Sequence, residues 1–218
     1  MDTASVRIRG YQPGDLADLY RICLLTADSG RDATALYTDP RLPGEIYAAP
    51  YGVFEPGLAF VAEDDEGVGG YVLGALDTAA FEERLERDWW PATRLAHPEP
   101  SPEVAAGLTP IAGYALHDIH HPWTTPVKLN RRYPSHLHID LRPRLQGQGL
   151  GRKLIAALLE QLARQGSRGL HLKVGRDNKR AVAFYRHLGF AEYPAATLGP
   201  EFPASHLHVF TLKLSARA

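Results

Sequence analysis

A glycine-rich segment, residues 144–151, has the residue types and spacing to bind a phosphate group. It reads Arg-Leu-Gln-Gly-Gln-Gly-Leu-Gly and follows a strand-like run at residues 135–141. The helix that begins there carries an apolar stripe made of Leu150, Leu154, Ile155, Leu158, Leu159 and Leu162. Backbone N–H groups at a helix start have no partner within the helix, and the positive end of its dipole lies behind them. Because glycine lets an anion approach these groups closely, the segment is a candidate site for phosphate or pyrophosphate.

Two common phosphate-binding loops do not fit this segment. A P-loop needs Gly-Lys-Ser/Thr, whereas Gly151 is followed by Arg152, Lys153 and Leu154. The dinucleotide-binding fingerprint needs its third glycine one position later and an acidic residue about twenty positions on, and residues 169–173 contain no acid. A glycine-rich turn without a ligand is the structural alternative.

The loop resembles that of the GNAT superfamily of N-acetyltransferases, which reads Arg/Gln-x-x-Gly-x-Gly/Ala. Arg144, Gly147 and Gly149 match it in register. A second match follows the strand-like run at residues 169–174. There the chain has an Asn, an Ala, a Phe-Tyr pair and a Gly-Phe pair on a short helix with a glycine cap, at Asn178, Ala181, Phe184, Tyr185, Gly189 and Phe190. An ordinary half-buried aromatic is the alternative interpretation of Tyr185.

The resemblance implies acetyl-CoA as co-substrate and no metal. It implies that backbone amides of residues 146–151 hold the pyrophosphate with help from Arg144, that the backbone of residues 139–141 pairs with the pantetheine arm, and that Tyr185 is the general acid. The implied coenzyme-binding residues are Ile139, Leu141, Arg144, Gln146, Gly147, Gln148, Gly149, Leu150, Gly151, Arg152, Asn178, Phe184 and Tyr185. A tyrosine suits the acid because it is neutral at pH 7 and can donate a proton.

The general base is not fixed by a family motif. In the strand at residues 135–141, alternation places Leu137, Ile139 and Leu141 on one face and His136, His138 and Asp140 on the other. A central strand covered on both faces should be apolar on both. The polar face is therefore either a buried hydrogen-bond network or the site of a base, with His138 and Asp140 as candidates. Asp77, which directly follows a strand, is a third candidate.

The element order predicts one α/β (α+β) domain over residues 1–218, with a mixed, mostly antiparallel seven-stranded sheet and helices on both faces. The expected strands lie at 5–9, 58–62, 68–75, 135–141, 169–174, 190–193 and 206–212, with helical segments at 13–25, 33–48, 150–162 and 178–188. This order is that of the GNAT fold, except for an insertion at residues 81–134 between the third and fourth strands.

The insertion is expected to be structured and to shape the acceptor pocket, with helices at 81–90 and 103–117 and a break at Pro110. His117 and His121 have the i, i+4 spacing of metal ligands, but Pro122 ends the helix there and no third ligand is evident, so no metal is expected. With the insertion, the chain resembles the acetyltransferase-like C-terminal domain of O-GlcNAcases and its free-standing bacterial relatives. The matching segments are 47–51, 60–74 with Asp77, 133–140 and 166–169.

Composition limits the partners. The chain has 218 residues and a net charge of −1, so nucleic acid is not an expected partner. No long apolar run is present, so neither a signal peptide nor a membrane span is expected, and the cytoplasm is the default location. The single cysteine, Cys23, excludes an intramolecular disulfide framework.

These observations lead to the hypothesis of a bacterial, acetyl-CoA-dependent N-acetyltransferase. It would act on a small-molecule or peptide amine by direct transfer in a ternary complex, with a homodimer as a possible assembly. The alternatives are a non-catalytic acetyl-CoA-binding or regulatory domain and an interaction module in which the insertion binds a partner.

Overall fold

The computed structural model describes residues 6–199, 202 and 205–214, so Ser5 of the first expected strand lies outside the described residues. Seven strands form one sheet in the order β1-β2-β3-β4-β5-β7-β6. Every neighbouring pair is antiparallel except β4 and β5, which are parallel. The strands are β1 (Arg7–Gly10), β2 (Ala59–Asp64), β3 (Gly67–Ala75), β4 (Ser135–Leu141), β5 (Gly169–Gly175), β6 (Ala191–Tyr193) and β7 (Leu207–Lys213). The expected fold class is thereby confirmed.

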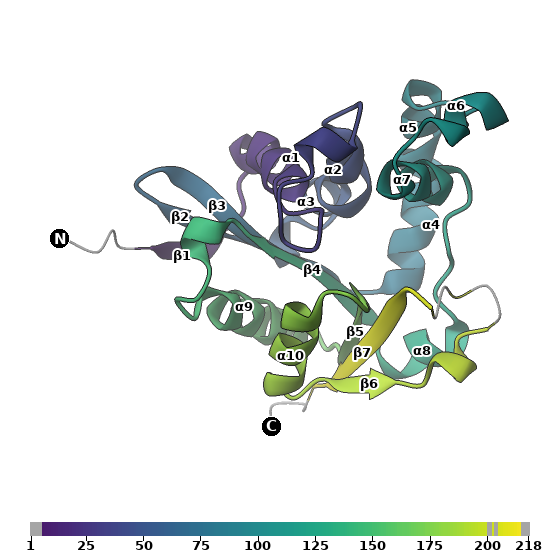
Figure 1. Ribbon diagram of the computed structural model, residues 1–218. Coiled ribbons are helices and arrows are strands. Elements are labelled where there is room, and N and C mark those ends of the chain that lie inside the picture. Colours follow the sequence, from purple (N-terminus) through teal and green to yellow (C-terminus); the bar gives the residue numbers. More distant parts are fainter. Residues whose placement is uncertain (1–5, 200–201, 203–204, 215–218) are drawn as a thin grey trace.

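Helices cover both faces of the sheet (Figure 1). On one face lie α1 (Leu16–Leu24), α2 (Leu42–Tyr47) and α3 (Ala49–Phe54), and on the other lie α9 (Leu150–Arg164) and α10 (Lys179–His187). Short 3-10 turns occur at Pro13–Asp15, Thr34–Leu36, Pro56–Leu58, Pro143–Leu145 and Ala195–Thr197. The two central helices of the sequence motifs, α9 and α10, therefore share one face.

The apolar stripe of α9 packs on the sheet as its spacing predicts. Leu150, Leu154, Ile155, Leu158 and Leu162 are buried in one core cluster, with Leu159 partly buried beside them. Strand β4 divides its side chains as predicted: Leu137, Ile139 and Leu141 belong to this α9 cluster. The polar residues of β4 face the other layer, where the His136 ring meets Tyr51 and Phe81.

The insertion between β3 and β4 is helical. It contains α4 (Thr78–Asp88), α5 (Trp90–Ala96), α6 (Pro102–Ala106), α7 (Pro110–His120) and α8 (Val127–Arg132). Pro110 stands at the first position of α7, where its missing N–H breaks no helix bond, so the predicted break is observed. Helices α5 to α7 stand at one edge of the molecule, whereas α8 lies near β6 and β7 (Figure 1). No helix in the described part of the chain is long and apolar enough to cross a membrane.

Candidate active site

The glycine-rich loop joins β4 to α9 with exposed backbone. Gly147 and Gly149 have φ of 76° and 75°, a left-handed conformation that costs about 1–2 kcal/mol for other L-residues. Gly149 is the N-cap of α9 and makes no side-chain cap, so the first amides of this helix remain available to a ligand. This end of the molecule has the backbone geometry of an anion site.

Side chains of the loop secure it to the protein. The Nε2 of Gln146 donates to the Leu141 carbonyl at 2.6 Å, and its Oε1 accepts from Arg180 at 2.5 Å. The Nε2 of Gln148 donates to the Arg144 carbonyl at 2.8 Å. These bonds leave the backbone N–H groups, rather than the glutamine side chains, as the groups that face a ligand.

Arg144 has a different task from the one its motif position suggests. Its guanidinium donates to both carboxylate oxygens of Asp64 at 2.9 Å and to the Gly67 carbonyl at 3.0 Å. Asp64 holds the Arg144 pKa above its usual value, and Arg144 holds that of Asp64 below its usual value. Arg144 therefore fastens the loop to the β2–β3 hairpin.

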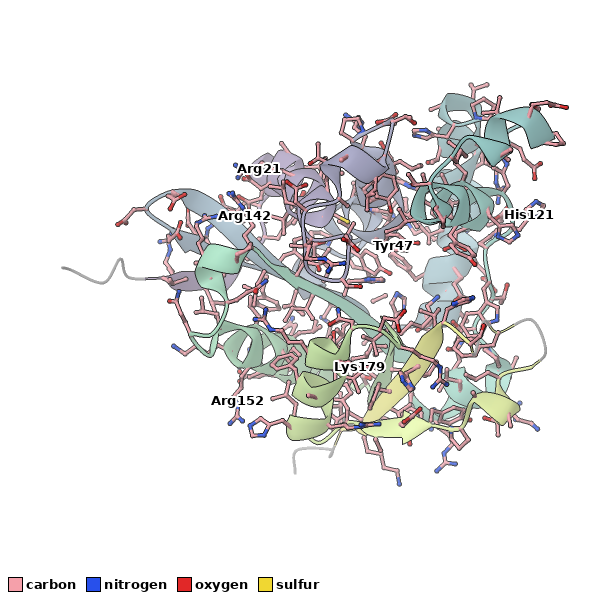
Figure 2. All side chains as sticks on the ribbon, viewed as in Figure 1. Arg21, Tyr47, His121, Arg142, Arg152 and Lys179 are labelled. Atoms are coloured by element: carbon pink, nitrogen blue, oxygen red, sulfur yellow. The ribbon has the colours of Figure 1, made fainter. Side chains whose placement is uncertain are left out.

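Arg152 lies on the outer side of α9 (Figure 2). Its Nη2 lies 2.7 Å from the Nε2 of His187 on α10. This contact ties the two helices together at the surface. A β-carbon on Gly151 would come within 3.0 Å of the Phe184 ring, so glycine here lets α9 and α10 approach each other.

The parallel strands β4 and β5 separate soon after they begin. Only Ser135–Leu170 and His136–His171 are paired, and the remainder of β4 up to Leu141 pairs with β3 alone. The backbone edge of Leu137–Leu141 that faces β5 therefore has no strand partner. The space between the two strands is a gap to which an extended chain could add as a strand does.

Helix α10 carries the second motif along this gap. The Asn178 Oδ1 caps the helix by accepting from the Ala181 N–H at 3.0 Å, so its side-chain oxygen is already used. Tyr185 is 7% exposed, and its ring packs against Phe190 and Phe210. Its hydroxyl forms no hydrogen bond with any described residue. Burial, with a smaller contribution from Asp140, raises the Tyr185 pKa, so the phenol stays protonated and able to donate.

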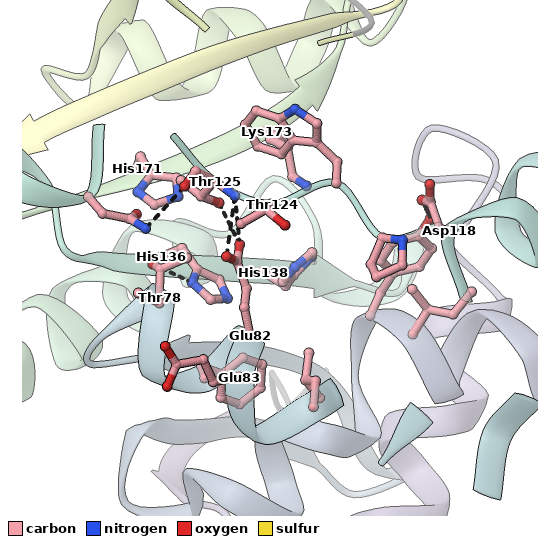
Figure 3. Close-up of a pocket in the computed structure, with 18 of the residues that line it drawn as sticks. Thr78, Glu82, Glu83, Asp118, Thr124, Thr125, His136, His138, His171 and Lys173 are labelled. Carbon is pink, nitrogen blue, oxygen red and sulfur yellow. Dashed lines mark hydrogen bonds between the residues drawn. The ribbon is translucent and has the colours of Figure 1, made fainter. Parts of the chain in front are cut away.

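A cavity of about 510 Å³ opens where β4 and β5 part (Figure 3). Residues 136–138 of β4 and 171–173 of β5 form its floor. Its walls come from α2, α3, α4, α7 and the segment 122–127, and include Tyr47, Tyr51, Glu82, Glu83, Asp118, Trp123 and Thr125. Its size is that of a small-molecule site. The insertion supplies much of the wall.

The two histidines of β4 differ in their partners. The Thr78 hydroxyl donates to the Pro134 carbonyl, so it must accept from the Nδ1–H of His136 at 2.8 Å. The His136 Nε2 then accepts from the Tyr51 hydroxyl at 2.7 Å. Both ring nitrogens of His136 are thus used, and burial keeps its pKa well below the usual value.

His138 lines the cavity beside the aromatic rings of Tyr47 and Tyr51, at centroid distances of 5.9 and 5.2 Å. Neither ring nitrogen bonds to a described residue. Burial, reinforced by Lys173, lowers its pKa to about 3, so the ring is neutral at pH 7 with a lone pair open to the cavity.

Asp140 does not line the cavity. Its Oδ2 accepts from the Tyr71 hydroxyl at 2.7 Å, which joins β4 to β3. Burial raises its pKa to about 6 against the opposing hydrogen bonds from Tyr71 and Thr26. Buried Cys23 also lies next to Tyr71, and burial raises its thiol pKa, so no reactive thiolate forms there.

Two other candidates have structural tasks. Asp77 is exposed and caps α4 by accepting from the Ala80 N–H at 3.1 Å. His117 and His121 stack at a centroid distance of 5.0 Å, and His121 bonds to Glu99. Figure 2 shows His121 at the outer side of the insertion. Among the described residues, no group of three His, Cys, Asp or Glu side chains has an arrangement that could hold a metal ion.

Four charged or aromatic cavity residues were not anticipated: Glu82, Asp118, Trp123 and Lys173. A signal existed for Lys173. It shares a face of the strand with His171 by period two, and it is the charged residue in the strand-like run at residues 169–174. The residues of α4 and α7 reach the cavity only through the packing of the insertion, which no local pattern reveals.

The model of the Acetyltransferase (GNAT) family matches residues 31–190, which include the loop, the gap and both motifs. The chain belongs to the GNAT acetyltransferase family. The fold agrees: the crystal structure of SsHAT superposes with a TM-score of 0.83 at 35% identity, covering 97% of this chain and 99% of that one.

Other similar proteins extend the comparison. Protein O-GlcNAcase of Rattus norvegicus is 27% identical over 185 residues, which is 85% of this chain but only 20% of that protein. The chain therefore spans about a fifth of the length of these O-GlcNAcases. A mycothiol acetyltransferase of Pseudarthrobacter chlorophenolicus is 29% identical over 195 residues, 84% of this chain and 52% of that protein. The structure of yncA of Salmonella typhimurium, described as an acetyltransferase with its cofactor acetyl-CoA, shares the fold at a TM-score of 0.56 and 17% identity, covering 99% of this chain and 97% of that one.

The loop gives the first testable prediction. Gly149→Glu places a carboxylate at the helix start and forces a positive φ on a residue with a side chain, so acetyl-CoA affinity should fall at least about tenfold. Gly149→Ala is the matched control, because a β-carbon there meets nothing within 4 Å and only the backbone strain remains. Calorimetric titration should rank wild type above Ala and Ala above Glu. Equal affinities for wild type and the Glu variant would exclude this loop from coenzyme binding.

Proposed function

We propose that this protein transfers an acetyl group from acetyl-CoA directly to a primary amine in a ternary complex. The observation that carries the proposal is the position of the cavity, whose floor is formed by β4 and β5 at the point where they separate. A donor arm lying along the gap, with its phosphates at the start of α9, would end at this floor. An amine in the cavity could then reach the acetyl group at the end of that arm.

The residues that fit the coenzyme are backbone groups more than side chains. Amides at Gly147–Gly151 suit its pyrophosphate. The edge of Ile139–Leu141 that has no strand partner suits its amide-bearing arm, with the Leu141 carbonyl already accepting from Gln146. When bound, acetyl-CoA supplies an acetyl group activated as a thioester. Holding that group beside the amine replaces a slow bimolecular encounter.

His138 is the proposed base. It faces the cavity, is neutral at pH 7 and has an unused lone pair. An imidazole with a low pKa is a weak base, but the proton on the amine becomes strongly acidic as the new C–N bond forms, so His138 can accept it at that stage. The amine must therefore enter the site neutral.

Tyr185 is the proposed acid, since its hydroxyl has no partner in the described residues and its raised pKa keeps it protonated. As the C–S bond breaks, it would give its proton to the departing sulfur. Asp140 is left as a positioning residue that holds β4 to β3 through Tyr71.

The test measures free-thiol release from acetyl-CoA with a panel of primary amines. Release that depends on the amine supports transfer, whereas coenzyme binding with no such release would identify a binding-only domain. His138→Gln should lower kcat on the order of 10²-fold, the usual scale for loss of a general base. Asp140→Asn, on the same face of the strand, is the matched control and should retain kcat within a few-fold. The reverse ranking would transfer the role of base to Asp140.

A further inference from the structure

Lys173 is a cation with no bonded counterpart at the active-site cavity. It lies on β5, two positions after His171 and on the same face of the strand, and its side chain extends into the cavity (Figure 3). Its Nζ lies 4.9 Å from the centre of the Trp123 ring, a cation–π contact. Among the described residues its ammonium has neither a hydrogen-bond acceptor nor an ion-pair partner, so its three N–H donors are unused by the protein.

The nearest carboxylates do not satisfy this charge, because both have other bonds. Glu82 accepts from the Thr125 hydroxyl at 2.6 Å and from its N–H at 3.2 Å. Asp118 accepts from the Tyr47 hydroxyl at 3.1 Å. Both are close enough to raise the Lys173 pKa, although the surrounding protein lowers it more. The side chain is nonetheless exposed at the cavity, so an anion from outside can reach the ammonium and compensate the solvation that the surrounding protein removes.

The shape and charge of the cavity restrict what this anion can be. The volume of about 510 Å³ suits a small molecule, and Tyr47, Tyr51 and Trp123 provide an apolar wall for its body. Glu82 and Asp118 share the space with Lys173, so a doubly charged phosphate would be repelled more strongly than a singly charged carboxylate.

We propose that Lys173 binds a carboxylate of the acceptor, so that the preferred acceptor is a small amine that also carries a carboxylate. The amine end lies toward His138 on β4 and the carboxylate end toward Lys173 on β5. Lys173 is then a specificity-determining residue, and this inference rests on the proposed acetyl transfer.

The test compares acceptors that differ only in the anionic group: tyrosine with tyramine, histidine with histamine, and β-alanine with propylamine and O-phosphoethanolamine. In the wild type, kcat/KM for at least one carboxylate-bearing amine should exceed that of its uncharged counterpart about tenfold or more. Lys173→Met retains the aliphatic stem and removes the charge. It should abolish this preference by raising KM for the carboxylate-bearing amine relative to its uncharged counterpart. The ratio between the two members of a pair is the readout, because loss of the Lys173 charge also alters the surroundings of His138, and it does so for both amines alike.

Two further variants make the result specific. Lys173→Arg should retain the preference, because it retains the cation. Lys128→Met, at an exposed lysine on α8 outside the cavity lining, should behave as wild type. A preference that survives in Lys173→Met, or equal use of the amines of every pair by wild type, overturns the inference while leaving acetyl transfer intact. Better use of O-phosphoethanolamine than of β-alanine overturns the choice of carboxylate.

Binding gives a readout that does not need turnover. Calorimetry of tyrosine and tyramine with the protein in the presence of coenzyme A should show tighter binding of tyrosine in the wild type and no difference in Lys173→Met. If no amine releases thiol yet this pattern holds, the proposed function fails and the carboxylate site stands. If neither compound binds, the carboxylate site fails.

Discussion

Between pH 7 and pH 5 the folded protein is expected to lose on the order of 4 kcal/mol of stability, because three histidines are held neutral in the fold. Burial lowers the pKa of His136 well below its usual value, that of His138 to about 3 and that of His171 to about 4. In the unfolded chain each titrates near 6.5. Below that pH the unfolded state binds protons that the folded state cannot.

The direction follows from which state takes up protons. For groups with a lowered pKa, stability is present above the unfolded value and is lost as pH falls below it, by up to about 1.4 kcal/mol per pH unit for each histidine. Asp140 opposes this loss. Its folded pKa of about 6 exceeds its usual 3.8, so the folded state gains a proton on it in the same interval.

Urea unfolding at pH 7, 6 and 5 and constant ionic strength measures the slope. His138→Gln should reduce the slope by about two fifths, since one of three similar proton sites is removed while Asp140 still opposes the other two. His117→Gln is the matched control because His117 is exposed on α7. A wild-type stability that stays level from pH 7 to pH 5 would show that these histidines become protonated within the fold.

Tyr185→Phe should lower kcat on the order of 10²-fold and leave acetyl-CoA affinity nearly unchanged. The substitution retains a ring that packs against Phe190 and Phe210 and removes only a hydroxyl that bonds to no described residue. Stability should therefore not fall. Because burial raises the Tyr185 pKa, the wild-type rate should show no loss from this group up to about pH 10, its ordinary value.

Steady-state kinetics with free-thiol detection and calorimetry of acetyl-CoA check this prediction. Tyr193→Phe on β6 is the control, since it makes the same chemical change in another core cluster. Wild-type kcat in the Tyr185 variant would mean that the thiolate leaves without this proton and that Tyr185 serves packing alone.

Local sequence patterns predicted the parts of the site that are encoded by short-range spacing. The stripe of α9, the two-sided alternation of β4 and the glycine-rich loop each depend on residues within a few positions of one another. The pairing of Arg144 with Asp64 spans 80 positions and follows from the arrangement of β3 beside β4, so the motif alone gave no sign of it. The separate environments of His138 and Asp140, two positions apart, arise in the same way from the elements packed against them.

The side chains that form the cavity wall could be predicted even less well from the sequence. Helix α4, helix α7 and the segment 122–127 approach β4 and β5 only after the insertion has folded. The position of the insertion in the sequence led to the prediction that it shapes the acceptor pocket, and that role stays a prediction. Which of its side chains line that pocket depends on helix packing that amphipathic periodicity does not specify.

The short pairing of β4 with β5 also affects how the two parts of the sheet are held together. The sheet has a four-stranded part, β1 to β4, and a three-stranded part, β5 to β7. Within the sheet, only the two paired positions between β4 and β5 join these two parts. A second contact between the two parts of the sheet comes from Leu129 of α8 and Tyr133, which directly follows α8. Both pack with Val209 of β7, beside the segment that forms part of the cavity wall. An extended chain bound in the gap would supply the backbone hydrogen bonds that β4 and β5 do not make with each other. It would thereby hold the two parts of the sheet together. Binding in the gap and the width of the cavity are then coupled, because both depend on the β4–β5 junction. The donor and the acceptor would therefore affect each other's binding without being in contact.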